Sequence, residues 1–147
     1  MKILVVTTGF PYFDNPNLAH ACKFVYYECL SYEKAGADVE VVTPGIPGVP
    51  SEYVVGRNIK VHRFRYFFPE KLQTVRRADG LALYTKMNLW FFFQLPFFLI
   101  AFCLAIIKHG KNADILHCSW TLSALLAFPL RILHRVPVTL TYRGSDI

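Results

Sequence analysis

The chain has 147 residues, enough for one domain with a hydrophobic core, and 54% of them are hydrophobic, which excludes an intrinsically disordered protein. The formal net charge of +6 is spread over short groups of basic residues, a pattern that favours an anionic membrane surface over nucleic acid as a partner. For the first of these groups, a solvated basic face is an equal alternative; its members are Arg57, Lys60, Arg63 and Arg65.

The cysteines indicate a reducing compartment. The four cysteines form no Cys-x-x-Cys pair, and no histidine stands at zinc-like spacing from any of them. They are Cys22, Cys29, Cys103 and Cys118. We therefore expect small buried thiols without disulfides, and no metal site. The chain passes from Met1 almost directly into an apolar strand, without the features of a secretory signal. These observations predict a cytoplasmic protein, or one on the cytoplasmic face of a membrane.

Residues 1–44 predict a β-α-β unit. Ile3–Thr7 is a continuous aliphatic run, typical of a parallel strand that is buried on both faces. Apolar residues then recur at helical spacing from Leu18, with Asn17 as the expected N-cap and Gly36 at the end of the helix. Val39–Thr43 forms the second buried strand, and the crossover between the two strands should be right-handed.

The loop between the first strand and its helix, Thr8–Asn17, contains neither Gly-x-Gly-x-x-Gly nor a P-loop. A dinucleotide or triphosphate cradle of those kinds is therefore disfavoured. Its aromatic residues Phe10, Tyr12 and Phe13 have two interpretations, which are stacking on a ligand and packing beneath the loop.

A third strand is expected from Ile59 to Phe64. Lys60, His62 and Arg63 interrupt its apolar residues, a pattern typical of a sheet edge. The stretch 69–86 is basic without a clear period, and we expect a loop with a short helix there.

The most apolar stretch is Leu89–Ile107, nineteen residues without a charge. A helix of this length could just cross a bilayer, and a true span is one hypothesis. A span would, however, place strands of one sheet on opposite sides of the membrane. We prefer a helix that packs on the sheet while its surplus apolar surface dips into the membrane interface. The expected membrane-contacting residues are Trp90, Phe91, Phe93, Phe97 and Phe98.

Two more strands complete the predicted sheet. Asp114–Cys118 is the fourth strand, followed by the loop Ser119–Thr121 at its carboxyl end. Thr121–Arg135 is an apolar helix that Pro129 should kink, and Val138–Thr141 is the fifth, buried strand. Strands that alternate with helices predict an α/β fold with a doubly wound parallel sheet.

A polar loop, Tyr142–Asp146, follows the last strand at the edge of the sheet where ligands of open α/β folds bind. Gly144 lets the backbone approach a ligand closely, and Arg143 and Asp146 supply charge. The alternative is an ordinary turn with a solvated ion pair.

Four segments in this order resemble the N-terminal half of glycosyltransferase family 4, a group of GT-B-fold enzymes that build bacterial and archaeal polysaccharides and glycolipids. They are Lys2–Pro11 (KILVVTTGFP), Ala35–Pro44 (AGADVEVVTP), Ala113–Trp120 (ADILHCSW) and Val136–Ile147 (VPVTLTYRGSDI). The resemblance implies a single Rossmann-like domain over residues 1–147, incomplete at its C-terminal end. It would face a donor-binding domain across the active-site cleft.

The resemblance also implies a retaining hexosyltransferase that moves a sugar from a nucleoside-diphosphate sugar to a membrane-associated glycan or lipid-linked acceptor. It implies neither a metal nor a covalently bound cofactor. Gly9 and Phe10 would face the cleft near the donor phosphates and the acceptor. Trp120, with its neighbours Ser119 and Thr121, would line the acceptor side.

The loop with Gly144 and Ser145 would border the reacting sugar, which makes Arg143 and Asp146 the candidate catalytic residues. Many family members carry histidine where this chain has Arg143. An arginine is always charged and cannot serve as a general base at neutral pH. Arg143 would therefore act electrostatically, on the leaving diphosphate or on an acidic acceptor.

Compared with the family, the C-terminal half is absent, so we expect residues 1–147 alone to be inactive. They would work at the inner face of the membrane, as a peripheral protein, with a C-terminal domain or a separate donor-binding subunit. An alternative function is a non-catalytic, membrane-recruited subunit that needs such a partner. A third hypothesis, a regulatory nucleotide-binding module, lacks a phosphate fingerprint.

Overall fold

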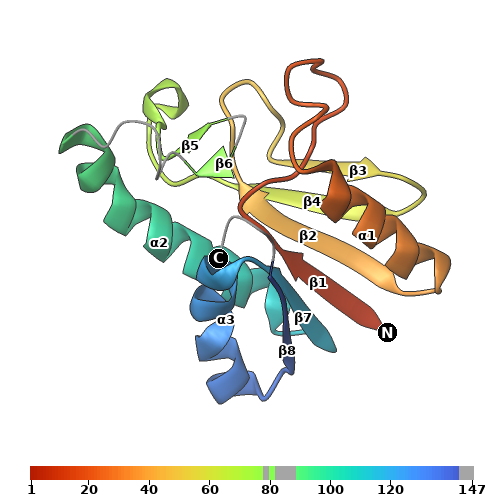
Figure 1. Cartoon of the computed structure of the whole chain (residues 1–147). Coiled ribbons are helices and arrows are strands. Elements are labelled where there is room, and N and C mark those ends of the chain that lie inside the picture. Colours follow the sequence, from red (N-terminus) through yellow and green to blue (C-terminus); the bar gives the residue numbers. More distant parts are fainter. Residues whose placement is uncertain (78–79, 82–88, 143–147) are drawn as a thin grey trace.

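The computed structural model describes residues 1–77, 80–81 and 89–142 (Figure 1). Its main sheet has the order β3-β4-β2-β1-β7-β8, in which β3 is antiparallel to its neighbour and the other strands pair in parallel. The strands are β1 (Lys2–Val6), β2 (Asp38–Pro44), β3 (Glu52–Val55), β4 (Ile59–Phe64), β7 (Ile115–Ser119) and β8 (Val138–Thr141). The remaining elements are α1 (Lys23–Lys34), the 3-10 helix η1 (Glu70–Leu72), β5 (Arg76–Arg77), β6 (Gly80–Leu81), α2 (Leu89–Gly110) and α3 (Thr121–His134).

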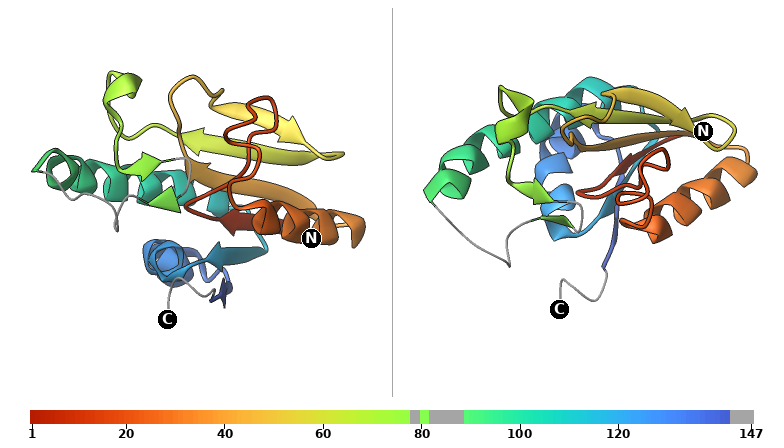
Figure 2. Two further views of the ribbon diagram at one scale, coloured as in Figure 1. Left: turned by 45° about the horizontal axis from the view of Figure 1, so that its top comes forward. Right: turned by 90° about the horizontal axis from the view of Figure 1, so that it is seen from above.

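The central strand β1 supplies both faces of the sheet with core residues. Ile3 and Val5 belong to a core with α1, whereas Leu4 and Val6 belong to a second core with α2 and α3. A strand buried on both faces requires the continuous aliphatic run seen in the sequence. The helices accordingly lie on opposite faces of the sheet, α1 on one and α2 with α3 on the other (Figures 1 and 2). The predicted doubly wound α/β fold is confirmed.

Helix α1 is shorter at its start than the sequence predicted. It begins at Lys23, and Asn17 lies in a turn and does not cap it. The left-handed backbone of Cys22, with φ 53°, separates these turns from the helix. The predicted end is confirmed: Gly36 has φ 84°, and its N–H donates to the carbonyl of Glu33, as in a Schellman-type C-cap.

Strand β4 is an inner strand, so its interpretation as a sheet edge was wrong. The outer position is taken by β3, which the sequence analysis missed and which reaches β4 through a turn at Gly56. Ile59, Val61 and Arg63 alternate along β4 and are all buried, while Lys60 between them is exposed. In the sequence, the charged residues obscured the alternation of buried and more exposed side chains that is typical of a strand.

Helix α2 is continuous across Pro96 and carries one buried stripe along the sheet. Phe91, Phe98, Phe102 and Ile106 are each at most 2% exposed. Phe91 and Phe98 therefore belong to the core, and the prediction that they contact a membrane was wrong. Helical spacing of three to four residues turned them inward.

Gln94 explains how a polar residue is tolerated inside this apolar helix. Its side chain is fully buried, and its amide donates to the carbonyl of Leu72 over 2.6 Å while its oxygen accepts the N–H of Thr74 over 3.1 Å. The indole of Trp90 donates to the same Leu72 carbonyl over 3.3 Å. These bonds tie the segment after η1 to the first half of α2.

At the other end of the sheet, α3 runs through Pro129 and leads into β8. The predicted strand Val138–Thr141 is confirmed, but its residues are half-exposed or exposed, not buried. The reason is its position, because β8 is the outermost strand of the sheet within the described residues.

The carboxyl ends of the strands are held together by one buried arginine. Arg63 is 3% exposed, and its guanidinium donates to the carbonyls of Phe10 (2.9 Å) and Pro44 (3.2 Å) and to the hydroxyl of Tyr53 (2.7 Å). Among the described residues no carboxylate lies within ion-pairing distance of it. Burial lowers the pKa of Arg63 below its ordinary value, but arginine remains charged in proteins. This one side chain links the loop after β1 with β2, β3 and β4.

Replacing Arg63 with methionine should lower the free energy of unfolding by roughly 3 kcal/mol, because buried acceptors lose a charged donor. Urea denaturation measures the loss. Arg65→Met is the matched control: Arg65 is exposed and pairs at the surface with Glu70, so we expect a change within about 0.5 kcal/mol. Equal losses in both variants would contradict the role assigned to Arg63.

Candidate functional site

The candidate site lies at the carboxyl ends of β1 and β7. The parallel strands have the order β4-β2-β1-β7-β8, so the chain winds away from β1 in both directions. In open α/β sheets, the crevice outside such a switch point binds ligands. The loops after β1 and β7 were both predicted to be functional, and the structure places the two strand ends side by side.

The loop after β1 turns inward. Gly9 is buried, and its N–H donates to the hydroxyl of Thr7 over 3.3 Å, while that hydroxyl donates to the Gly9 carbonyl over 2.9 Å. Phe10 is fully buried against α1, with its ring edge-on to Tyr26. The prediction that the side chain of Phe10 faces an open cleft was therefore wrong, because the apolar core under α1 takes up the ring. Packing beneath the loop is therefore confirmed for Phe10, whereas Tyr12 is half-buried and Phe13 is exposed.

The loop after β7 holds the most unusual backbone of the site. Trp120 has φ 72° and ψ 151°, a region that glycine adopts readily and L-residues rarely do. Its ring is half-buried and meets Phe24 of α1 edge-on at 5.7 Å. Its N–H donates to the carbonyl of Thr141 over 3.3 Å, which joins this loop to the end of β8. Thr121, the next residue, is exposed and begins α3.

Three hydroxyl groups near the carboxyl edge are buried without a hydrogen-bond partner in the described part of the chain. They belong to Thr43 on β2, Ser119 at the end of β7 and Ser123 in the first turn of α3. Buried polar groups are normally paired with protein or with water, so these hydroxyls are available to a water molecule or a ligand. Ser119 was predicted from the sequence. Thr43 and Ser123 were not, because a threonine ending a strand and a serine within a helix carry no signal of their own.

The last predicted loop begins at Tyr142, whose side chain is exposed. Arg143, Gly144, Ser145 and Asp146 lie outside the described residues. Their assignments at the reacting sugar therefore stay predictions.

The thiols do not supply a nucleophile to this site. All four cysteines are free, and Cys29 and Cys118 are buried. Burial raises the pKa of the Cys118 thiol, one residue before Ser119, to about 12, and it also raises the pKa of Cys29. A thiol with such a pKa stays protonated at neutral pH and is inert. The expectation of small thiols without disulfides is confirmed for these positions.

A polar network that sequence analysis did not identify joins α1 to β7 and β8. His117 lies 3.1 Å from a carboxylate oxygen of Glu28, and its ring nitrogens approach the hydroxyls of Thr139 (3.1 Å) and Thr141 (3.2 Å). The hydroxyl of Tyr32 donates to Glu28 over 3.2 Å. The network holds α1 against the strands that carry the Trp120 loop. Its members come from separate elements, so no spacing in the sequence could indicate it.

The chain matches, over residues 24–147, the family model described as a glycosyl transferase 4-like domain. No curated protein sequence matches the chain. Two structures of sucrose-phosphate synthase from Thermosynechococcus elongatus are similar, one with a TM-score of 0.61 and 17% identity over 99% of this chain, the other with 0.60 and 16% over 98%. The catalytic domain of starch synthase IV from Arabidopsis thaliana, bound to ADP and acarbose, has a TM-score of 0.52 and 15% identity over 96% of this chain. The chain spans 65% of the first of these structures and 33% of the other two.

Two substitutions at Trp120 test whether its backbone is strained. Both Trp120→Ala and Trp120→Gly remove the ring, but only glycine adopts this backbone without a Cβ penalty. We therefore expect the glycine variant to have a free energy of unfolding higher than the alanine variant by about 1 kcal/mol. Chemical denaturation of the two variants measures this difference. An alanine variant at least as stable as the glycine variant would show that the loop is relaxed.

Proposed function

Because the chain belongs to the glycosyl transferase 4-like domain family, we propose that it is the acceptor-binding part of a retaining glycosyltransferase. The donor is a nucleoside-diphosphate sugar, and the acceptor is a membrane-associated glycan or a lipid-linked sugar. A C-terminal domain or a separate subunit holds most of the donor. The protein works on the cytoplasmic side, as a peripheral protein of the inner membrane face.

The observation that carries the choice of acceptor is the outer face of α2. By length and composition, this helix is apolar and long enough to cross a membrane. Only 28% of its most apolar window is buried inside the protein, so much of its apolar surface is exposed. The exposed side chains include Phe93 (54%), Phe97 (47%), Ile100 (59%) and Leu104 (60%). We call these four residues the outer stripe of α2. Exposed apolar surface of this kind favours a membrane or lipid contact.

A groove beside the outer stripe suits a lipid. Its volume is about 380 Å³, and aromatic and aliphatic side chains line it, among them Phe67, Phe68, Phe97 and Ile100. Arg65 lies at the same groove and is exposed. An apolar groove with a cation at its rim matches an acyl chain that carries an anionic head group.

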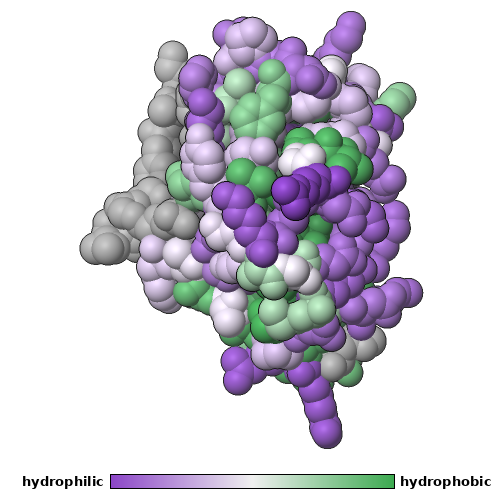
Figure 3. All heavy atoms as spheres, turned by 90° about the vertical axis from the view of Figure 1, so that its right-hand side faces the viewer, coloured by the Kyte–Doolittle hydropathy of each residue, from purple (hydrophilic) through white to green (hydrophobic). Residues whose placement is uncertain are grey.

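The apolar surface does not extend over the whole molecule. The side of the sheet where the amino ends of the strands lie is mostly hydrophilic, with small hydrophobic areas between the polar groups (Figure 3). This asymmetry favours a protein that rests on a membrane by the side of the sheet that carries α2 and α3, since α3 also exposes large apolar side chains.

Attachment to the interface fits the sheet better than a membrane span does. β1 precedes α2 in the chain and β7 follows it, and the two strands are hydrogen-bonded neighbours. A span would pull them to opposite sides of the bilayer. Gln94 and the stripe from Phe91 to Ile106 are also committed to contacts within the protein.

The double variant Phe93→Ser, Phe97→Ser should release the protein from vesicles that contain anionic lipid, because it removes two exposed rings and no core residue. Vesicle co-sedimentation measures the bound fraction, which we expect to fall at least tenfold. Phe13→Ser combined with Tyr27→Ser is the matched control, since it removes two exposed rings on or near α1. If the control variant dissociates equally, general hydrophobicity and not the outer stripe causes the binding.

Arg143→Ala tests the catalytic assignment in the complete protein. If Arg143 stabilises charge on the leaving diphosphate, kcat should fall by about 100-fold while the unfolding temperature changes little. Sugar transfer to membrane acceptors, followed with radiolabelled donor, measures this effect. Full activity would identify the loop as an ordinary turn, and transfer that requires a second polypeptide would support the subunit alternative.

A further inference from the structure

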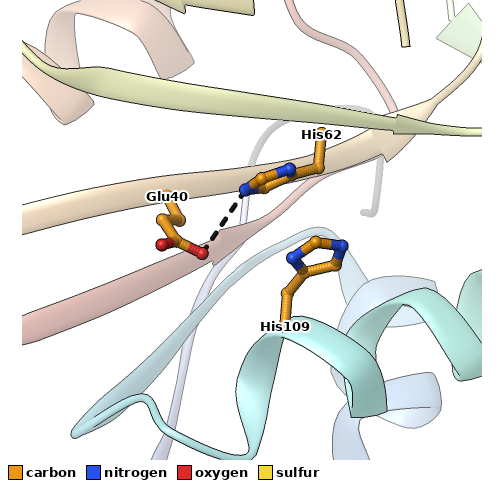
Figure 4. A group of neighbouring side chains, drawn as sticks. All are labelled: Glu40, His62 and His109. Carbon is orange, nitrogen blue, oxygen red and sulfur yellow. Dashed lines mark ion pairs between the residues drawn. The ribbon is translucent and has the colours of Figure 1, made fainter. Parts of the chain in front are cut away.

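A group of three potential metal ligands lies between the sheet and the last turn of α2, away from the carboxyl edge. Glu40 comes from β2, His62 from β4 and His109 from α2 (Figure 4). One ligand atom from each residue lies within 4.8 Å of the other two. All three side chains turn toward the same space (Figure 4).

His62 has both ring nitrogens buried, and neither makes a hydrogen bond within the described residues. Nε2 lies 3.4 Å from a carboxylate oxygen of Glu40, and Nδ1 lies 3.5 Å from one of Glu52. These separations are too long for good hydrogen bonds. The contact between His62 and Glu40 is a long ion pair (Figure 4), and a metal ion at this place would take both groups as ligands.

The carboxylate of Glu40 is oriented for this role. Lys2 binds its Oε1 over 3.0 Å, so the oxygen that faces His62 is Oε2. Holding one oxygen of a ligating carboxylate in place is a common task of residues around a metal. Glu40 and Glu52 supply the negative charge of the cluster, which also has the cations Lys2, Lys108, Arg63 and Arg65 around it.

A cavity borders the two histidines of the cluster, whereas Glu40 lies behind them and is buried. The cavity, of about 290 Å³, is lined by Glu52, His62 and His109, together with Lys108 and Arg63. Glu52 is largely exposed, so its carboxylate can approach an ion from the solvent side. The cavity provides both an entry path and space for a bound water.

We propose that Glu40, His62 and His109 bind a divalent transition-metal ion of the zinc class, with Glu52 or water as the fourth ligand. Two imidazoles and carboxylate oxygen suit Zn²⁺ and its neighbours and are a poor match for Mg²⁺ or Ca²⁺, which prefer oxygen ligands alone. Ligand atoms about 2.0–2.1 Å from a tetrahedral ion lie roughly 3.4 Å apart. Because the ligand atoms lie within 4.8 Å of one another, the widest pair has to close by at most roughly 1.4 Å, within the reach of side-chain rotation.

Metal binding has a defined structural consequence. The rings of His62 and His109 are now stacked, with centroids 3.9 Å apart and an angle of 24° between their planes. Ring lone pairs lie in the ring plane, so the two must rotate out of the stack to point at one ion. The ion would then connect the end of α2 with β2 and β4. None of the three ligands lines the proposed acceptor groove, although Arg65 borders both cavities, and the ion would fix the helix that lines that groove.

The test is a Zn²⁺ titration of the full-length protein after treatment with a chelator, followed by calorimetry. We expect one equivalent to bind and the unfolding temperature to rise, since an ion bound only by the folded state stabilises it. His62→Gln and His109→Gln should each weaken binding at least tenfold, as losing even an indirect metal partner costs about 10–100-fold. His20→Gln, which changes an exposed histidine outside the cluster, should bind like the parent protein.

A second readout distinguishes ligation from loose association. Co²⁺ in place of Zn²⁺ should give the visible absorption bands of a tetrahedral ion, and these bands should be lost in the His109→Gln variant. Circular dichroism of each variant confirms that it is folded. If the parent protein binds Zn²⁺ no more tightly than the double variant His62→Gln, His109→Gln, or if His20→Gln weakens binding as much as His109→Gln does, the site does not exist.

Discussion

The carboxyl edge of the sheet depends on the buried positive charge of Arg63, which pairs with no carboxylate in the part of the chain that the structure describes. Burying a guanidinium is costly unless its donors are all engaged. Each of the three guanidinium nitrogens of Arg63 donates a hydrogen bond, to main-chain carbonyls from the loop after β1 and the end of β2 and to the Tyr53 hydroxyl from β3. Carbonyls in turn need a donor when they are buried. The cation and the loops therefore stabilise each other, and the carboxyl edge that carries the candidate site is built around them.

The parts of this fold that the sequence predicted are those governed by local pattern. The aliphatic runs of β1 and β2 and the glycine after α1 each carry their physical cause within a few residues. The start of α1 and the position of β4 were misread because the deciding facts are not local. Cys22 adopts a left-handed backbone, and Arg63 faces inward because acceptors from other segments surround it. A charged residue in a strand looks like surface until its partners are known.

The candidate site was likewise predicted only in part from the sequence. Its location after β1 and β7 follows from the fold class, and the sequence predicted it. The roles of individual side chains were harder to predict, because Phe10, in the loop after β1, packs into the core under α1. The strained backbone of Trp120 leaves no trace in the sequence. The Glu40, His62 and His109 cluster has no motif spacing at all, since its members are separated along the chain and are brought together by the pairing of β2 with β4 and the packing of α2.

Helix α2 links the fold to the proposed function, because it contacts three other parts of the protein and also carries the outer stripe. Its first half holds the segment after η1 through Gln94, its inner stripe completes the core, and its last turn brings His109 to the sheet. With three sides fixed, the direction of the outer stripe is set by the protein and not by a membrane. A rigidly oriented apolar face defines the angle at which the domain can rest on a bilayer. For the proposed glycosyltransferase, that angle determines how far the loops after β1 and β7 stand from the lipid surface. The packing of α2 would then select which membrane-bound acceptors reach the cleft.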